Sequence, residues 1–131
     1  MRPIADSGLL VGFLDSSDQF HSWASECFEG LSSALTSCEA VVAETEYLVP
    51  GSGPLLMEMI NRGTLTIASL LPSETAALSA LMKKYKGMQF ADACVVRLSE
   101  LLPGAVVYTT DKKDFSIYRR RGRELIKTVT P

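Results

Sequence analysis

The sequence predicts an α/β protein of three layers, with helices on both faces of a central parallel sheet of about four to five strands. Short apolar runs alternate with amphipathic stretches along the whole chain, which is typical of successive β-α units. The run from Ala105 to Thr109 (AVVYT) is almost continuously apolar, as in a strand buried within a parallel sheet. The chain has 131 residues, 47% of them apolar, and we therefore expect one domain over residues 1–131.

The first elements follow from apolar spacing. Residues 2–6 form a short apolar run, which predicts a buried strand, and residues 8–14 predict a brief helix. A turn then leads to Asp18, the expected N-cap of a helix over residues 19–34 whose apolar positions recur at helical spacing. A very short second strand is expected at 35–37.

The middle of the chain predicts two helices and a strand. Residues 39–49 have a helical pattern, with Leu48 among the residues expected to face the core. The sequence PGSGP breaks this pattern, and a short helix is expected at 55–62. The segment 64–70 (TLTIASL) is rich in β-forming residues and predicts the third strand.

The last third repeats this alternation. Helices are expected at 74–86 and 90–102, each with apolar residues at helical spacing. The apolar strand at 105–109 follows. After a loop and helical turn at 112–118, residues 125–127 predict an edge strand.

Composition excludes several classes of protein. The net charge of −2 provides no global positive field for nucleic acid, although charge can be local. The three cysteines, Cys27, Cys38 and Cys94, are widely spaced, which argues against a zinc site or a disulfide framework. No signal-peptide core is recognisable, and no apolar run reaches the roughly 18–20 residues of a membrane helix. We expect a soluble cytoplasmic protein.

Neither a G-x-G-x-x-G nor a P-loop motif is present, which argues against the usual nucleotide-binding folds.

Acidic residues fall at the ends of predicted elements or within apolar stretches. Asp6 and Asp111 each follow a predicted strand, and Asp114 comes one helical turn later. Glu44 and Asp92 stand among apolar residues of two predicted helices. Because the carboxyl ends of parallel strands share one edge of the sheet, we expect these acids to converge there.

Converging carboxylates repel one another strongly unless a cation lies between them. All-oxygen ligation favours Mg²⁺ or Mn²⁺ over zinc. Each acid also has a structural interpretation: Asp6, Asp111 and Asp114 as cap or turn residues, Asp92 as a first-turn helix charge, and Glu44 as a structural residue. The case for a metal site therefore depends on all of them together. His21, the only histidine, is given no catalytic role.

Four blocks of the sequence resemble the PIN domain, the fold of VapC-type toxins. They are Asp6-Ser7-Gly8-Leu9-Leu10, the stretch from Thr36 to Leu48, Phe90-Ala91-Asp92-Ala93, and Thr109-Thr110-Asp111-Lys112-Lys113-Asp114-Phe115. They span nearly the whole chain in the family's order. Gly8 departs from the Ser or Asn usual there, and Gln89 replaces an acid that many relatives carry.

The resemblance implies a Mg²⁺- or Mn²⁺-dependent endoribonuclease, often the toxin of a type II toxin–antitoxin pair. Family members are usually homodimers inhibited by a small antitoxin protein. The resemblance assigns the family's acids to Asp6, Glu44, Asp92 and Asp111, with Asp114 near the site.

Our first hypothesis is therefore an enzyme in which a metal-activated water attacks an RNA phosphodiester. The catalytic candidates are Asp6, Glu44, Asp92 and Asp111, and the candidate metal ligands are Asp6, Asp92, Asp111 and Asp114. The only strong basic cluster follows the fourth acid and is a candidate RNA-binding surface or simply a solvated one. It comprises Lys112, Lys113, Arg119, Arg120, Arg121 and Arg123.

Two alternatives remain. Gln89 favours a catalytically inactive module that binds RNA or a protein. Another Mg²⁺-dependent phosphoryl-transfer enzyme is the weaker option, because no D-x-D motif follows the first strand. The apolar helices expected at 39–49 and 55–62 either offer a face for a homodimer or simply pack into the core.

Overall fold

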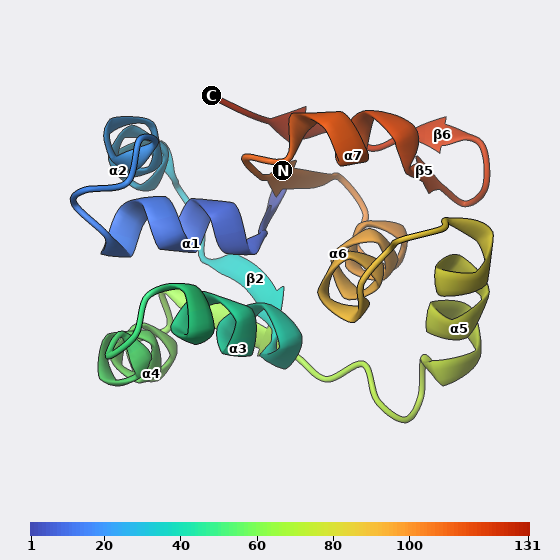
Figure 1. Cartoon of the computed structure of the whole chain (residues 1–131), viewed down its shortest axis with the longest axis horizontal. Helices are drawn as coiled ribbons and strands as arrows, with labels where there is room; N and C mark the ends of the chain where they lie inside the picture. The colour runs from blue at the N-terminus through green and yellow to red at the C-terminus, as the bar shows by residue number, and fades with distance from the viewer.

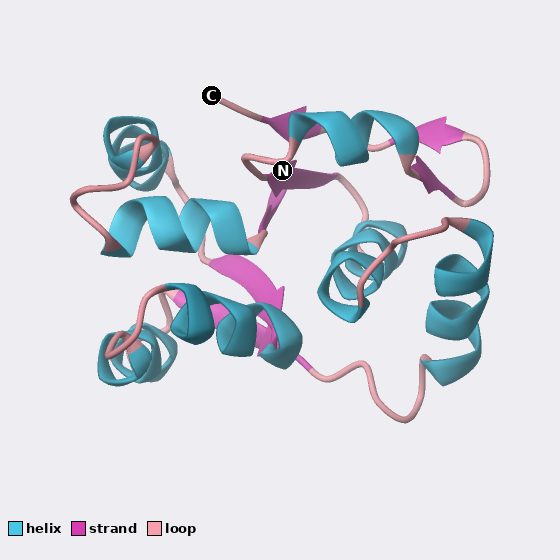
Figure 2. Ribbon diagram, viewed as in Figure 1, coloured by secondary structure: helices cyan, strands magenta, loops and turns pink.

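The structure, a computed structural model, describes all of residues 1–131 and contains seven α-helices and seven short β-strands (Figures 1 and 2). The strands are β1 (Arg2–Ala5), β2 (Leu35–Cys38), β3 (Leu65–Ala68), β4 (Ala105–Tyr108), β5 (Arg119–Arg120), β6 (Glu124–Leu125) and β7 (Thr128–Val129). The helices are α1 (Ser7–Leu14), α2 (His21–Gly30), α3 (Glu39–Leu48), α4 (Gly53–Asn61), α5 (Thr75–Lys84), α6 (Phe90–Leu101) and α7 (Lys112–Ile117).

Five strands form the central sheet in the order β3-β2-β1-β4-β7, and every neighbouring pair is parallel. The chain steps from β1 to β2 to β3 in one direction, then returns to β4 on the other side of β1 and continues outward to β7. Right-handed crossovers therefore place α1 to α4 on one face and α5 and α6 on the other. Figure 1 shows this arrangement. The predicted three-layer α/β/α fold is confirmed.

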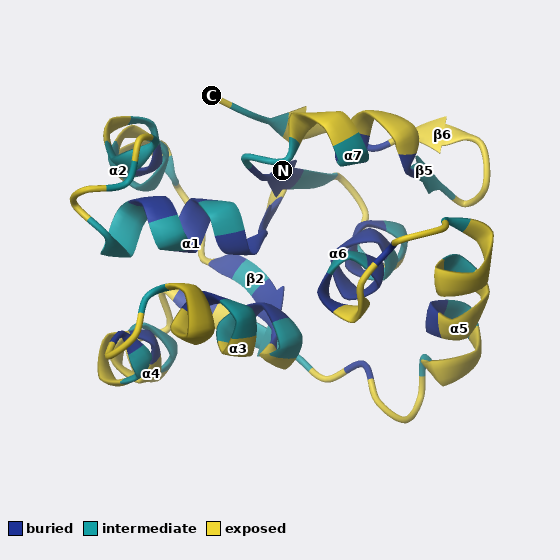
Figure 3. Cartoon of the chain, in the orientation of Figure 1, coloured by how far each residue is buried: buried dark blue, intermediate teal, exposed yellow.

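The hydrophobic core lies between the sheet and its helices and contains 24 buried residues. Helix α6 contributes most heavily, since seven of its twelve residues are buried, and Figure 3 shows it as the darkest of the helices. The predicted strand at 105–109 supplies Val107 and Tyr108 to this core. Because β1, β4 and α6 pack together here, the ends of these three elements are held rigidly.

The predicted edge strand at 125–127 is wrong. Glu124 and Leu125 pair antiparallel with Arg119 and Arg120 in a separate hairpin, where Arg121 and Gly122 make a turn with positive φ angles. The chain then returns to the main sheet, and β7 pairs with β4. Two-residue strands of this kind depend on tertiary pairing and leave little pattern in the sequence.

The other elements agree with the prediction to within a few residues, except at α2. This helix begins at His21 and its N-cap is Phe20, so the predicted N-cap at Asp18 is wrong. The carboxylate of Asp18 instead accepts a hydrogen bond from the Phe20 N–H in the preceding turn. Leu48, expected in the core, is 52% exposed because α3 turns that face outward.

All three cysteines are free; Cys38 and Cys94 are buried, whereas Cys27 is only partly buried. None of the seven helices combines the length and the apolar character that crossing a bilayer requires.

Candidate functional site

Asp6 lies where β1 ends and α1 begins, and both elements hold it in place. Its N–H continues the ladder with β4 by donating to the carbonyl of Tyr108 (3.0 Å). Its carboxylate caps α1, since Oδ1 accepts from the Ser7 N–H (2.9 Å). The side chain is only 5% exposed. The structural interpretation of Asp6 as a helix cap is thus correct, and it does not prevent the carboxylate from facing a pocket.

Strands β1 and β4 are neighbours, and the chain leaves them in opposite directions, from β1 toward β2 and from β4 toward β7. Open α/β sheets bind ligands where the strand order reverses in this way. Asp111 follows β4 there. It is the N-cap of α7, and its Oδ1 accepts from the Asp114 N–H (3.0 Å). Asp6 and Asp111 therefore meet at one edge of the sheet, as predicted.

Thr109 joins these two acids, and our sequence analysis gave it no role. Its buried hydroxyl donates to Oδ2 of Asp6 (2.6 Å) and accepts from the N–H of Asp111 (3.0 Å). A threonine two residues before an acid at the end of an apolar strand is the signal that could have identified it. The hydroxyl fixes the Asp6 carboxylate relative to the start of α7.

Glu44 enters the site from α3, where it is partly buried. The hydroxyl of Ser7, the first residue of α1, lies close enough to this carboxylate to lower its pKa. Burial raises the pKa of Glu44 above its usual value, and the neighbouring charge of Asp92 adds to this effect. Ser7, whose N–H donates to Asp6, therefore lies beside two of the acids, a role that the sequence did not reveal.

Asp92 occupies the first turn of α6, where a negative charge interacts favourably with the helix dipole. It forms a capping box with Gln89, the N-cap residue: the Gln89 side chain accepts from the Asp92 N–H, and Oδ2 of Asp92 accepts from the Gln89 N–H (3.4 Å). Gln89 therefore stabilises the helix end that carries Asp92.

One pocket of about 330 Å³ collects the four catalytic candidates. Its walls also include Asp18, a fifth carboxylate that the sequence analysis expected only as a helix N-cap. No lysine, arginine or histidine lines it. The residues that line it are Asp6, Ser7, Gly8, Val11, Asp18, Gln19, Phe20, Glu44, Leu48, Asp92, Thr110 and Asp111.

Three acids of this pocket, Asp6, Glu44 and Asp92, have raised pKa values, mainly because they are buried. Burial raises the pKa of Asp6 to about 6, although the hydrogen bonds from Thr109 and Ser7 oppose this shift. The charges of Asp92 and Glu44 raise it further. Burial likewise raises the pKa of Asp92. Perturbed acids gathered in one cleft are characteristic of functional sites.

Asp114 stands apart from the other four. It lies in the first turn of α7 but does not line the pocket. Its pKa is raised, by its partial desolvation and by the neighbouring Asp111. Its role as a metal ligand stays a prediction.

The predicted RNA-binding residues separate into two groups. Lys112 and Lys113 are exposed at the start of α7, directly after Asp111. Arg119, Arg120 and Arg121 instead make contacts within the protein. Arg119 donates to the carbonyls of residues 116–118 at the end of α7.

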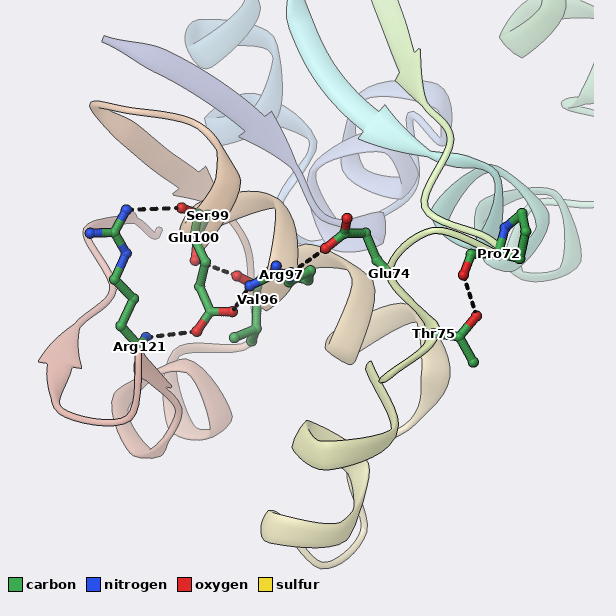
Figure 4. Close-up of polar contacts among 8 residues, drawn as sticks. All are labelled: Pro72, Glu74, Thr75, Val96, Arg97, Ser99, Glu100 and Arg121. Atoms are coloured by element: carbon green, nitrogen blue, oxygen red, sulfur yellow. Dashed lines mark hydrogen bonds and ion pairs between the residues drawn. The ribbon is translucent and has the colours of Figure 1, made fainter. Parts of the chain in front are cut away.

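The other two arginines attach the hairpin to α6. Nε of Arg120 donates to the carbonyl of Ser99 (2.6 Å). Figure 4 shows Arg121 contacting Glu100, which accepts from the Arg121 N–H (2.6 Å) and also pairs with Arg97 (3.1 Å). Arg97 in turn reaches Glu74 at the start of α5 (2.7 Å). These ion pairs stabilise the packing of α5, α6 and the hairpin.

The donor set of the pocket fits a hard divalent cation, because it consists of carboxylate oxygens without a positive side chain. No group of three or more acidic, histidine or cysteine side chains is arranged to hold one ion by itself. Mg²⁺ is commonly held by one or two protein carboxylates and keeps several of its waters. The residues present therefore fit Mg²⁺ or Mn²⁺ better than a metal that needs a complete protein cage.

Comparison with known proteins gives one informative relative and no matching family model. The chain is 27% identical to Ribonuclease VapC26 of Mycobacterium tuberculosis (strain ATCC 25618 / H37Rv) over 126 residues. The alignment covers 91% of this chain and 93% of that protein. This similarity over nearly the full length of both chains agrees with the VapC-like resemblance of the motifs and supports a ribonuclease at the level of the family.

Proposed function

We propose that this protein is a Mg²⁺- or Mn²⁺-dependent endoribonuclease that hydrolyses RNA phosphodiesters. The observation that carries the proposal is a pocket at the topological switch point of the sheet that is lined by five carboxylates and no basic side chain. The similarity to a VapC ribonuclease over 91% of the chain supports RNA as the substrate.

Asp6, Asp92 and Asp111 are the residues that would hold the cation. A bound divalent ion supplies polarisation of the phosphodiester and neutralises the charge that develops on its oxygens. Asp6 is the most deeply buried of these carboxylates, so its charged form gains most from a nearby positive charge. Thr109 and Ser7 keep it oriented by hydrogen bonds to its two oxygens.

Glu44 is the candidate proton acceptor. It lines the pocket from α3, opposite the strand ends, and its raised pKa makes it a better base than an ordinary surface carboxylate. In this role it takes a proton from the water that attacks the phosphorus atom. Ser7 lies beside this carboxylate at the pocket wall.

RNA phosphates need a positive surface beside this acidic pocket. Lys112 and Lys113 provide it, because they are exposed and directly follow Asp111. Arg119, Arg120 and Arg121 already form hydrogen bonds within the protein, so they are weaker candidates for phosphate contacts than the two lysines.

From the resemblance of its motifs to VapC-type toxins, the proposal includes the toxin role of a type II toxin–antitoxin pair, a small antitoxin partner and a cytoplasmic location. The proposal also includes a homodimer. Exposed apolar side chains on α3 and α4 provide the surface, namely Tyr47, Leu48, Leu55 and Met57.

The test is cleavage of a structured RNA by the purified protein, with Mg²⁺ or with EDTA. Asp6→Asn and Asp92→Asn replace carboxylates by amides of the same size. We expect cleavage by the original protein only with the metal, and a loss of at least about a hundredfold in each variant. Unchanged cleavage by both variants would refute the metal site.

A second candidate is an inactive module with the same fold that binds RNA or a protein. The inactive module is favoured by one observation: no three acidic, histidine or cysteine side chains are arranged to hold one metal ion. Metal titration separates the two, because a protein that binds a cation in its folded state is stabilised by it. An inactive module gains no stability from Mg²⁺ or Mn²⁺.

A further inference from the structure

An aromatic cluster connects α7 to the start of α6. Tyr118, the C-cap residue of α7, is 5% exposed and contacts two other rings edge to face. Its ring centroid lies 5.1 Å from that of Tyr85 and 5.2 Å from that of Phe115. These contacts enclose the ring of Tyr118 and so fix the position of its hydroxyl.

The hydroxyl faces Asp92, one of the residues that line the acidic pocket. The Tyr118 hydroxyl donates to Oδ2 of Asp92 at 3.4 Å, and it has no other hydrogen-bond partner in the protein. A phenylalanine would fill the same space without placing a hydroxyl beside the carboxylate of Asp92. A buried hydroxyl is destabilising unless it is hydrogen-bonded, and Asp92 is the acceptor for the hydroxyl of Tyr118. The hydroxyl therefore acts on the Asp92 carboxylate in addition to the packing of the ring.

The two donors to Asp92 meet at the same oxygen. Oδ2 accepts from the Tyr118 hydroxyl and from the Gln89 N–H, each at 3.4 Å, whereas Oδ1 has no donor within the protein. The carboxylate is thus held from one side. Its other oxygen remains available to a ligand of the pocket that Asp92 lines.

We propose that Tyr118 is a positioning residue that orients the Asp92 carboxylate, so that Oδ1 is presented to a divalent cation. The inference rests on the proposed function and adds to it a residue outside the acidic set. Hydrogen-bond partners of metal-ligating carboxylates commonly contribute about 10–100-fold to metal affinity or activity. The contact here is long, and we expect an effect at the lower end of that range.

The test compares Tyr118→Phe with the matched variant Tyr85→Phe. The hydroxyl of Tyr85 belongs to the same aromatic cluster but accepts from the Arg119 N–H (2.9 Å) and touches no acid. Mn²⁺ affinity is measured by isothermal titration calorimetry, and circular dichroism confirms that both variants are folded. RNA cleavage is measured across the same range of Mn²⁺ concentrations.

We expect Tyr118→Phe to bind Mn²⁺ about tenfold more weakly, while Tyr85→Phe binds as the original protein does. Cleavage by Tyr118→Phe should recover to within about twofold at saturating Mn²⁺, because the defect is in metal binding. Equal affinity of Tyr118→Phe and the original protein would overturn the positioning role alone, as would an equal loss in Tyr85→Phe. An original protein that binds no Mn²⁺ would overturn the proposed function as well.

Discussion

The hydroxyl of Thr109 donates a 2.6 Å hydrogen bond to Oδ2 of Asp6, across a separation of 103 residues in the chain. The same oxygen of Thr109 accepts from the N–H of Asp111. One buried hydroxyl thereby connects the acid after β1 to the acid after β4. The arrangement of the pocket depends on this connection as much as on the acids themselves.

Thr109→Val keeps the shape of the side chain and removes the hydroxyl. The Asp111 N–H then loses its acceptor and Asp6 loses a donor, so we expect a destabilisation of about 1–3 kcal/mol. The pKa of Asp6 should rise further, because the Thr109 hydrogen bond lowers it in the original protein. Urea unfolding measures the first effect, and Mg²⁺-dependent cleavage should fall at the same time.

Thr45→Val is the matched control. Thr45 is also fully buried, and its hydroxyl donates within α3 to the carbonyl of Val41 (2.8 Å). This variant should lose stability without a comparable loss of cleavage. Equal losses of cleavage in both variants would contradict a specific role for Thr109.

The raised pKa of Asp6 predicts that the metal-free protein is less stable at neutral pH than at pH 4. The folded state binds a proton at Asp6 up to pH of about 6, whereas the usual pKa is 3.8. The contribution of Asp6 to the free energy of unfolding is therefore greatest below pH 3.8 and is lost as the pH rises through about 6. A difference of roughly two pKa units corresponds to about 3 kcal/mol.

The free energy of unfolding, measured in EDTA between pH 4 and pH 7.5, checks this prediction. Asp6→Asn carries no titrating group at this position and should show a smaller decline over the same range. Glu44 and Asp92 shift in the same direction, so the difference between the two proteins is the relevant quantity. Parallel pH profiles would show that Asp6 has an ordinary pKa.

Gly8 is required because the segment that follows β4 approaches α1 closely at Thr110. A Cβ at this position would lie 2.0 Å from Oγ1 of Thr110 and 2.9 Å from its Cβ. We expect Gly8→Ala to destabilise the protein by about 1–3 kcal/mol, despite the better helix propensity of alanine. Urea unfolding is the measurement, and adding Thr110→Gly should restore much of the loss by removing the clash.

Gly30 provides the control for this substitution. It is the last residue of α2, and no atom lies within 4 Å of the position that its Cβ would occupy. Gly30→Ala should therefore be neutral or slightly stabilising. A Gly8→Ala variant as stable as Gly30→Ala would show that α1 can move away from Thr110 at little energetic cost.

The two groups of basic residues should respond differently to substitution. Replacing Lys112 and Lys113 by glutamine should weaken RNA binding and reduce the slope of log K against log salt by about 1.4, if each contacts one phosphate of a single strand. Arg120→Gln should instead cost about 1–3 kcal/mol of stability, because Arg120 holds the Ser99 carbonyl. Binding to a fluorescent RNA at several salt concentrations distinguishes these outcomes. A reduced slope in Arg120→Gln would assign that arginine to the RNA.

The sequence was sufficient to predict the sheet and the convergence of the four acids. Apolar periodicity located β1 and β4, and parallel topology placed Asp6 and Asp111 at the same edge. These features depend on local pattern and on general rules of chain crossover. Glu44 and Asp92 were found because a charge among apolar residues is unusual.

The contacts that orient the acids could not be predicted in this way. Thr109, Ser7 and Tyr118 reach their partners only after distant segments have packed together. Gln89 seemed to be a missing acid, although it caps the helix that carries Asp92. The strand β7 was missed for the same reason, because two residues become a strand only through pairing with β4.

The most direct test of a shared cation is the thermal unfolding midpoint at pH 7.5, measured first in EDTA and then at rising concentrations of Mn²⁺. The account predicts a midpoint that rises with Mn²⁺ in the original protein and stays constant in a variant carrying both Asp6→Asn and Asp92→Asn. A midpoint that is independent of Mn²⁺ in the original protein, or that rises equally in the double variant, would contradict a cation held by these carboxylates.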